Sequence, residues 1–163
     1  MMNSSAQSMP QSPKRLRNAL FWFLGVGFIG FLDSVYLTVT RFIGEPVACG
    51  FFTGCEVVAS SSYSAIAGIP ISLFGALYYL FWMLLGVWYL DSRNPLFFTL
   101  LPLTSAGFVA SLILTGIQLF VIDAICLYCV LSAASSTALF ILSFVIRKAG
   151  SGETLATIHS PQI

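Results

Sequence analysis

Four long runs of apolar residues limit the folds open to this chain more than any other feature. They cover approximately residues 18–40, 71–90, 96–122 and 124–146, and Asp33 is the only charged residue among them. Each run is long enough to cross a bilayer, which takes about 20 apolar residues in a helix. Charged residues make up 8% of the chain, against roughly a quarter in soluble domains. We therefore expect an all-α integral membrane protein with a four-transmembrane-helix bundle.

The basic residues indicate how the four helices are oriented. Six of the seven lie beside one set of helix ends: Lys14, Arg15, Arg17, Arg93, Arg147 and Lys148. Arg41 lies on the other side. Because cytoplasmic loops are enriched in Lys and Arg, we expect a multi-pass protein of the inner (plasma) membrane with both termini in the cytoplasm. The net charge of +1 gives no indication of a nucleic-acid partner.

The chain is predicted to have one membrane domain and an elaborated outer loop. We expect the domain to cover residues 14–149, with disordered cytoplasmic tails over 1–13 and 150–163, which are polar and have little to bury. The outer loop, 41–70, is long for a connection, and long loops are usually functional. Within it, residues 56–61 are predicted to form a short helix that lies over the bundle as a lid.

The four cysteines form two close pairs, both expected on the extracytoplasmic face. Cys126 and Cys129 lie three residues apart in the first turns of the fourth run, so they share a helical face and a disulfide between them is reachable. The positive end of a helix favours a thiolate there. Cys49 and Cys55 lie in the glycine-containing outer loop. Because a thiolate attacks a neighbouring disulfide, an exposed pair and an embedded pair indicate an electron relay.

Two other interpretations of the cysteines stay open. Four cysteines are able to form a zinc or copper site, although the only histidine, His159, lies in the C-terminal tail. The pairs are also compatible with two structural disulfides. Either interpretation predicts a non-enzymatic protein, such as a membrane metal carrier or an assembly factor.

Asp33 is the one ionisable group inside an apolar run. A carboxylate within a membrane is costly and is a functional candidate for that reason. It is expected either to supply protons in a reaction or to form a polar pair with Ser34 or Tyr36.

Several motifs, in their order and spacing, resemble the vitamin K epoxide reductase family in its bacterial form. They are Asp33-Ser34-x-Tyr36-Leu37, the loop cysteines Cys49 and Cys55 with Glu56-Val57-Val58 after them, Ser60-Ser61, Gly68-Ile69-Pro70-Ile71-Ser72-Leu73-Phe74-Gly75, and Cys126-Leu127-Tyr128-Cys129. The resemblance extends over nearly the whole membrane region.

This resemblance implies a four-helix bundle around a quinone, either ubiquinone or menaquinone. A disulfide between Cys126 and Cys129 would lie beside the quinone ring. Cys49 would meet an external thioredoxin-fold, DsbA-like protein, and Cys55 would carry electrons from Cys49 to Cys126. Cys129 would pass them to the quinone. Many bacterial members carry a fused thioredoxin-like domain, and we expect the partner of this chain to be a separate protein.

The resemblance also implies supporting residues. Ser61 is similar to the functional serine of the family, although a hydroxyl there also bonds readily to nearby backbone. Phe74 is a candidate to line the quinone pocket or to belong to the core. Animal members bond their ligand through an asparagine and a tyrosine where this chain has Ile71 and Ala133. We therefore expect quinone reduction rather than epoxide reduction.

The sequence thus predicts a membrane thiol:quinone oxidoreductase that reoxidises an extracytoplasmic dithiol protein and so drives disulfide bond formation. The redox-active centre is the set of four cysteines, and no metal is required. The disulfide bond formation protein B family has similar chemistry. It places its Cys-x-x-Cys after the first span and its widely spaced pair in the second outer loop, which is the reverse of the order in this chain.

Overall fold

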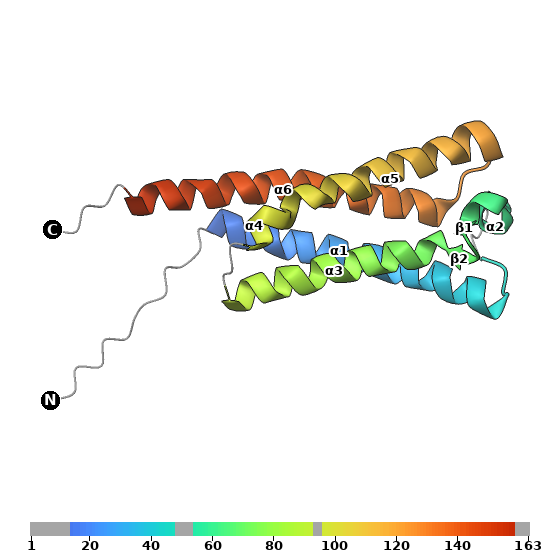
Figure 1. Ribbon diagram of the computed structural model, residues 1–163, viewed down its shortest axis with the longest axis horizontal. Coiled ribbons are helices and arrows are strands. Elements are labelled where there is room, and N and C mark those ends of the chain that lie inside the picture. Colours follow the sequence, from blue (N-terminus) through green and yellow to red (C-terminus); the bar gives the residue numbers. More distant parts are fainter. Residues whose placement is uncertain (1–13, 48–53, 93–95, 159–163) are drawn as a thin grey trace, which may run out of the picture.

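The computed structural model describes residues 14–47, 54–92 and 96–158. In this part of the chain, four helical segments are long and apolar enough to cross a bilayer. They are α1 (Lys14–Ile43), α3 (Ile71–Ser92), the composite segment Leu96–Ile122, and α6 (Leu127–Ile158). They run alongside one another in one elongated bundle (Figure 1). The predicted four-helix membrane fold is confirmed.

The third segment changes helix type along its length. It consists of α4 (Leu96–Leu100), η2 (Leu101–Leu103), α5 (Thr104–Ile117) and the π-helical turn η3 (Gln118–Ile122). Pro102 lies in η2, and because proline has no backbone N–H it interrupts the α-helical hydrogen bonding. The segment ends at Asp123, whose φ of 53° is left-handed, a conformation that commonly ends helices.

The helix α1 lies at the centre of the bundle, packed along both α3 and α6, while α5 packs on α6. Gly30 allows the close approach of α1 and α3, because a Cβ added there would lie 2.5 Å from the ring of Tyr79. In lipid there is no hydrophobic driving force for helix association, so small residues and tight packing hold such bundles together.

An aromatic core fixes the end of the bundle at which α1 begins. Phe23 packs edge-on against Trp82 and Phe97, with ring centroids 5.9 Å and 6.0 Å apart. All three side chains are buried, and Phe97 also stacks on Tyr89 at 4.9 Å. Such pairs each contribute about 0.5–1.5 kcal/mol beyond area burial. The core therefore anchors α1, α3 and α4 to one another.

Two features of α6 correct the sequence-based expectation. Residues 123–126 are not helical, so α6 begins at Leu127, three residues later than the expected fourth span. At the other end α6 continues to Ile158, so residues 150–158 are helical rather than part of a disordered tail. The glycines of this stretch cost only about 1 kcal/mol each relative to alanine, which does not end a helix that already has many turns. Residues 1–13 and 159–163 lie outside the described residues.

The outer loop contains a short helix and a minimal hairpin. The helix α2 (Gly54–Ser60) is followed by η1 (Ser62–Ser64) and by the antiparallel strands β1 (Ala65–Ile66) and β2 (Ile69–Pro70). Ala67 and Gly68 both have positive φ, 52° and 82°, as a type I′ hairpin turn requires. A short helix is thus present where one was expected, and its role as a lid stays a prediction.

Candidate functional site

The cysteines of the described chain gather at one end of the bundle. Figure 1 shows α2, β1 and β2 at the same end as the start of α6, opposite the end where α1 begins. Cys55 in α2 and Cys126 before α6 are both buried and belong to one cluster with Val47. Cys129 packs against this cluster. Cys49 lies outside the described residues.

The described cysteines are in two redox states. Cys55 is disulfide-bonded, whereas Cys126 and Cys129 carry free thiols. The disulfide between Cys126 and Cys129 that the family resemblance implies is therefore open in this structure. A relay needs the embedded pair in both states, because it accepts electrons as a disulfide and donates them as a dithiol.

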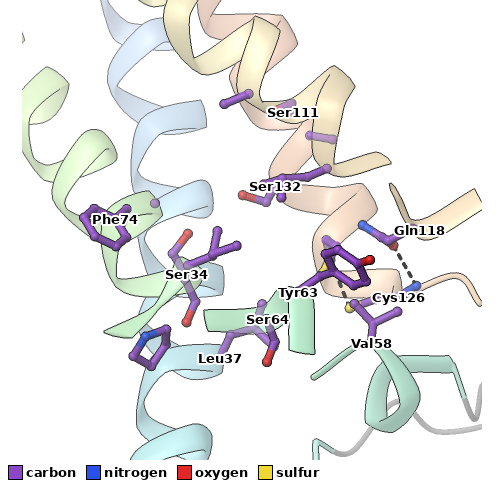
Figure 2. Close-up of a pocket in the computed structure, with 18 of the residues that line it drawn as sticks. Ser34, Leu37, Val58, Tyr63, Ser64, Phe74, Ser111, Gln118, Cys126 and Ser132 are labelled. Atoms are coloured by element: carbon purple, nitrogen blue, oxygen red, sulfur yellow. Dashed lines mark hydrogen bonds between the residues drawn. The ribbon is translucent and has the colours of Figure 1, made fainter. Parts of the chain in front are cut away.

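A cavity of about 400 Å³ opens beside the thiols. Residues from α1, α2, α3, α5 and α6 contribute to its wall, and Figure 2 shows several of their side chains pointing into one space. Of the residues predicted from sequence, Ser61, Phe74, Cys126 and Cys129 line it. Its wall is mainly apolar, with hydroxyl groups interspersed. That composition suits a small organic ligand with few polar atoms.

Cys126 caps the helix that contains Cys129. The backbone N–H of Cys129 donates to Cys126 Sγ at 3.3 Å, and the N–H of Val130 donates to the Cys126 carbonyl at 3.0 Å. The Cys126 N–H donates to Gln118 Oε1 at 3.1 Å (Figure 2). A sulfur in the position of an N-cap acceptor receives the unpaired N–H groups of the first helical turn. This N–H donation stabilises a negative charge on Cys126 Sγ.

Hydrogen bonding makes Cys126 an acidic thiol. The Cys129 side chain, hydrogen-bonded to Cys126, lowers the pKa of the Cys126 thiol from 9.0 to about 7. Burial acts in the opposite direction, and the backbone N–H groups of Cys129 and Tyr128 lower the pKa further. Near neutral pH a large fraction of Cys126 is therefore thiolate, the form that attacks disulfides and quinones.

Alkylation of Cys126 is expected to follow a titration with a midpoint near pH 7. Only the thiolate reacts, so the rate falls about tenfold for each pH unit below the midpoint. In Cys129→Ala the midpoint moves to higher pH, because the contact that lowers the pKa most is gone. Iodoacetamide labelling, quantified at Cys126 by mass spectrometry, measures both profiles. An unchanged midpoint in the variant would contradict this account.

Ser61 and Phe74 are placed differently in the cavity wall. The Ser61 hydroxyl donates to the Val58 carbonyl at 2.7 Å, which is the local backbone bond expected of such a serine. Phe74 lies on α3 and is about half exposed. Ser61 therefore holds the end of α2, while Phe74 contributes a half-exposed apolar side chain to the cavity wall.

Asp33 does not line the cavity. It is 6% exposed, and neither carboxylate oxygen has a hydrogen-bond partner within the described residues. The predicted polar pair with Ser34 or Tyr36 is therefore absent from the described part of the chain. Its neighbour Ser34 does line the cavity. The charge of Asp33 also raises the pKa of Cys126, which lines the cavity, so the carboxyl group lies near the wall.

Sequence reasoning missed several polar residues of the site. Gln118 fixes the Cys126 backbone, and the Tyr79 hydroxyl donates to the Ser132 carbonyl at 2.7 Å. Ser132 and Ser136 follow Cys129 by three and seven residues, so they share its helical face, and all three line the cavity. Polar residues at that spacing inside an uncharged span were the available signal.

A metal site finds no support among the described side chains. No three of their His, Cys, Asp and Glu residues come together as ligands. What the fold brings together is a thiol pair, a neighbouring disulfide-bonded cysteine and an apolar cavity, within four helices of membrane length. These features define a membrane thiol–disulfide oxidoreductase.

The particular family follows from comparison with known proteins. The model of the Vitamin K epoxide reductase family matches residues 21–144. The chain therefore belongs to this family, as its motifs predicted. A search of curated proteins gives no match to the chain. The matched range contains all four cysteines, together with Asp33, Ser61 and Phe74.

Proposed function

We propose that this protein is a quinone-dependent thiol oxidoreductase, which takes two electrons from a thioredoxin-fold dithiol protein outside the cytoplasm and reduces a membrane quinone. One observation carries the proposal: Cys126 and Cys129 line an apolar cavity, while Cys55 is buried in the same cluster as Cys126. The chemistry of both half-reactions is thus available at one site. Its product outside the cell membrane is a protein disulfide.

We propose that the outer disulfide joins Cys55 to Cys49. In the first half-reaction, one thiolate of the partner attacks Cys49, which forms a mixed disulfide and releases Cys55 as a thiolate. The second thiolate of the partner then resolves the mixed disulfide, which completes the partner disulfide and releases Cys49. The Cys55 thiolate then attacks Cys126 Sγ of the inner disulfide, so that a Cys55–Cys126 bond forms and the Cys126–Cys129 bond breaks. Attack of Cys49 on Cys55 restores the outer disulfide and releases Cys126. The sum is a partner disulfide and an inner dithiol, a transfer of two electrons.

In the second half-reaction the inner dithiol reduces the quinone. Two electrons and two protons leave Cys126 and Cys129, and the inner disulfide forms again. A volume of about 400 Å³ is within the range of small-molecule sites, and the mixture of apolar wall and hydroxyl groups fits a ring with two carbonyl oxygens. The hydroxyl groups of Ser34, Ser111 and Ser132 are the candidates to orient that ring.

The orientation supports the same direction of electron flow. Lys14, Arg15 and Arg17 begin α1, and Arg147 and Lys148 lie in the later part of α6. All belong to the end of the bundle away from Cys126 (Figure 1). Arg41 lies at the cysteine end. The positive-inside rule then favours both termini in the cytoplasm and the thiols on the extracytoplasmic face of the plasma membrane.

Asp33 is proposed to handle protons in quinone reduction. The reaction moves two protons from the thiols to the quinone oxygens within an apolar cavity, and Asp33 has the only ionisable carboxyl within the four apolar runs. We expect Asp33→Asn to lower turnover about a hundredfold, a typical effect of losing a general acid. It should also shift the Cys126 alkylation profile to lower pH, because the charge of Asp33 raises the pKa of Cys126.

Asp91→Asn, at an exposed position near the end of α3, is the matched control for Asp33→Asn. It should change neither turnover nor the alkylation profile. If Asp33→Asn turned over quinone at the rate of the unchanged protein, Asp33 would have no part in proton transfer.

The decisive experiment combines purified protein, a reduced thioredoxin-fold protein and a soluble quinone, with quinone absorbance as the readout. Oxidation of the dithiol at the rate of quinone loss is the expected result. A ubiquinone and a menaquinone analogue, tested separately, identify the preferred acceptor. Absence of turnover with every partner and quinone would favour the non-enzymatic alternative, a metal carrier or assembly factor.

A further inference from the structure

Gly54 is the first residue of α2 and directly precedes Cys55. A Cβ added to Gly54 would overlap the carbonyl oxygen of Ile125, and it would lie 3.0 Å from the carbonyl carbon and 3.1 Å from the nitrogen of that residue. All three atoms belong to the backbone, so no side-chain rotation relieves the clash. Gly54 thus brings two backbones into direct contact, one residue before Cys55 and one residue before Cys126.

The segment on the other side of this contact is held firmly. Asp123 adopts a left-handed conformation, and the N–H of Ala124 donates to the Gln118 carbonyl at 3.2 Å. The N–H of Cys126 donates to the side chain of the same glutamine at 3.1 Å. Displacing Ile125 would break these bonds, which cost about 1 kcal/mol or more each when their groups stay buried.

The helix α2 is held less firmly. It packs against the cluster of Val47, Cys55 and Cys126, Cys55 is disulfide-bonded, and an exposed hydrogen bond of 3.2 Å runs from Arg41 Nη1 to the Ala59 carbonyl. Cys55 attacks Cys126 as a thiolate, so its disulfide is open in the step considered, and the packing and the exposed hydrogen bond then hold α2. An added methyl group at Gly54 would therefore move α2 rather than Ile125. Cys55, the next residue, would move with it.

We propose that Gly54 is a positioning residue, which sets the approach of Cys55 to Cys126 for disulfide exchange. The inference rests on the proposed function, because that is where Cys55 attacks Cys126. The step forms the Cys55–Cys126 bond, breaks the Cys126–Cys129 bond and leaves Cys129 as a thiolate. Such attack requires near-contact of the sulfur atoms, and a misplacement of about 1 Å can slow a positioned reaction about a hundredfold.

The exchange step is isolated in a chain that carries Cys49→Ser and Cys129→Ser, which leaves Cys55 and Cys126 to react with each other. Diamide oxidation of the purified membrane protein forms the Cys55–Cys126 disulfide, and peptide mass spectrometry quantifies it. Addition of Gly54→Ala should slow its formation at least tenfold. A bifunctional methanethiosulfonate with a short spacer should still link the two sulfurs, because α2 is displaced and not unfolded.

Gly25→Ala is the matched control, since a Cβ on that α1 glycine meets nothing within 4 Å. It should leave the disulfide rate unchanged. Equal diamide rates for Gly54→Ala and Gly25→Ala would overturn the inference, and so would loss of the spaced link, which would mean that α2 has lost its place altogether.

With all four cysteines present, Gly54→Ala should lower turnover driven by the protein dithiol at least tenfold, while turnover driven by dithiothreitol is unchanged. The Cys49→Ser, Cys55→Ser double variant establishes how fast dithiothreitol reduces the inner pair directly. An equal loss with both reductants in Gly54→Ala would overturn the positioning role. If the unchanged protein reduced no quinone with either reductant, the proposed function would be refuted. The diamide assay would still test the role of Gly54, because it uses no quinone.

Discussion

Replacing Cys129 by alanine is expected to reduce quinone-dependent dithiol oxidation to the rate measured without protein. Without Cys129 no inner disulfide forms, so Cys55 has no bond to attack and the quinone has no dithiol to oxidise. In the proposed mechanism, electrons pass from the first half-reaction to the second only through Cys126 and Cys129, so no other covalent path replaces this pair. The loss therefore exceeds that of any other single change proposed for this chain.

The same assay, with quinone absorbance as readout, separates this loss from misfolding. In Cys129→Ala, Cys126 should still be alkylated, because its thiol remains at the N-terminal end of α6. The midpoint of the alkylation profile should move to higher pH. Ser135→Ala is the control for a small change in the same helix: Ser135 is buried, and its hydroxyl donates to the Leu131 carbonyl at 2.9 Å. If Cys129→Ala retained turnover, the redox role of the cysteines would be contradicted, and they would instead be structural disulfides or metal ligands.

The membrane fold was predictable because its signal is composition over long stretches. Three of the four runs have no charged residue. Their preference for a membrane therefore does not depend on how the helices pack against one another. The start of α6 was not predictable in the same way. It depends on the left-handed conformation of Asp123 and on the capping sulfur of Cys126, which periodicity does not report.

The site was predictable in its cysteines and less so in its wall. Spacing alone places Cys126 and Cys129 together, but the contact of Gly54 with Ile125 joins residues 71 positions apart. The sequence shows that Asp33 is the one ionisable group in the apolar runs, whereas its position near the cavity wall depends on the rotation of α1 against α3 and α6. Periodicity gives the face of a helix, and packing between helices decides what that face meets.

Filling the cavity is the change expected to have the next largest effect, through Ala133→Phe. Ala133 lies on α6 between the lining residues Ser132 and Ser136 and itself lines the cavity. A benzyl group in a space of about 400 Å³ occupies volume that a quinone ring needs, and it offers no hydroxyl group. We expect the KM for quinone to rise at least tenfold, which corresponds to about 1.4 kcal/mol or more of lost binding.

Ala134→Phe is the control for Ala133→Phe, because the neighbouring alanine is exposed and does not line this cavity. Turnover is measured over a range of quinone concentrations for both variants, alongside the Cys126 alkylation profile, which reports the thiols without quinone. Ala134→Phe should behave as the unchanged protein, and Ala133→Phe should retain its alkylation midpoint near 7. Equal KM values for the two variants would place quinone reduction outside this cavity. The thiols would then have to reach their acceptor at another surface, which the burial of Cys126 makes difficult.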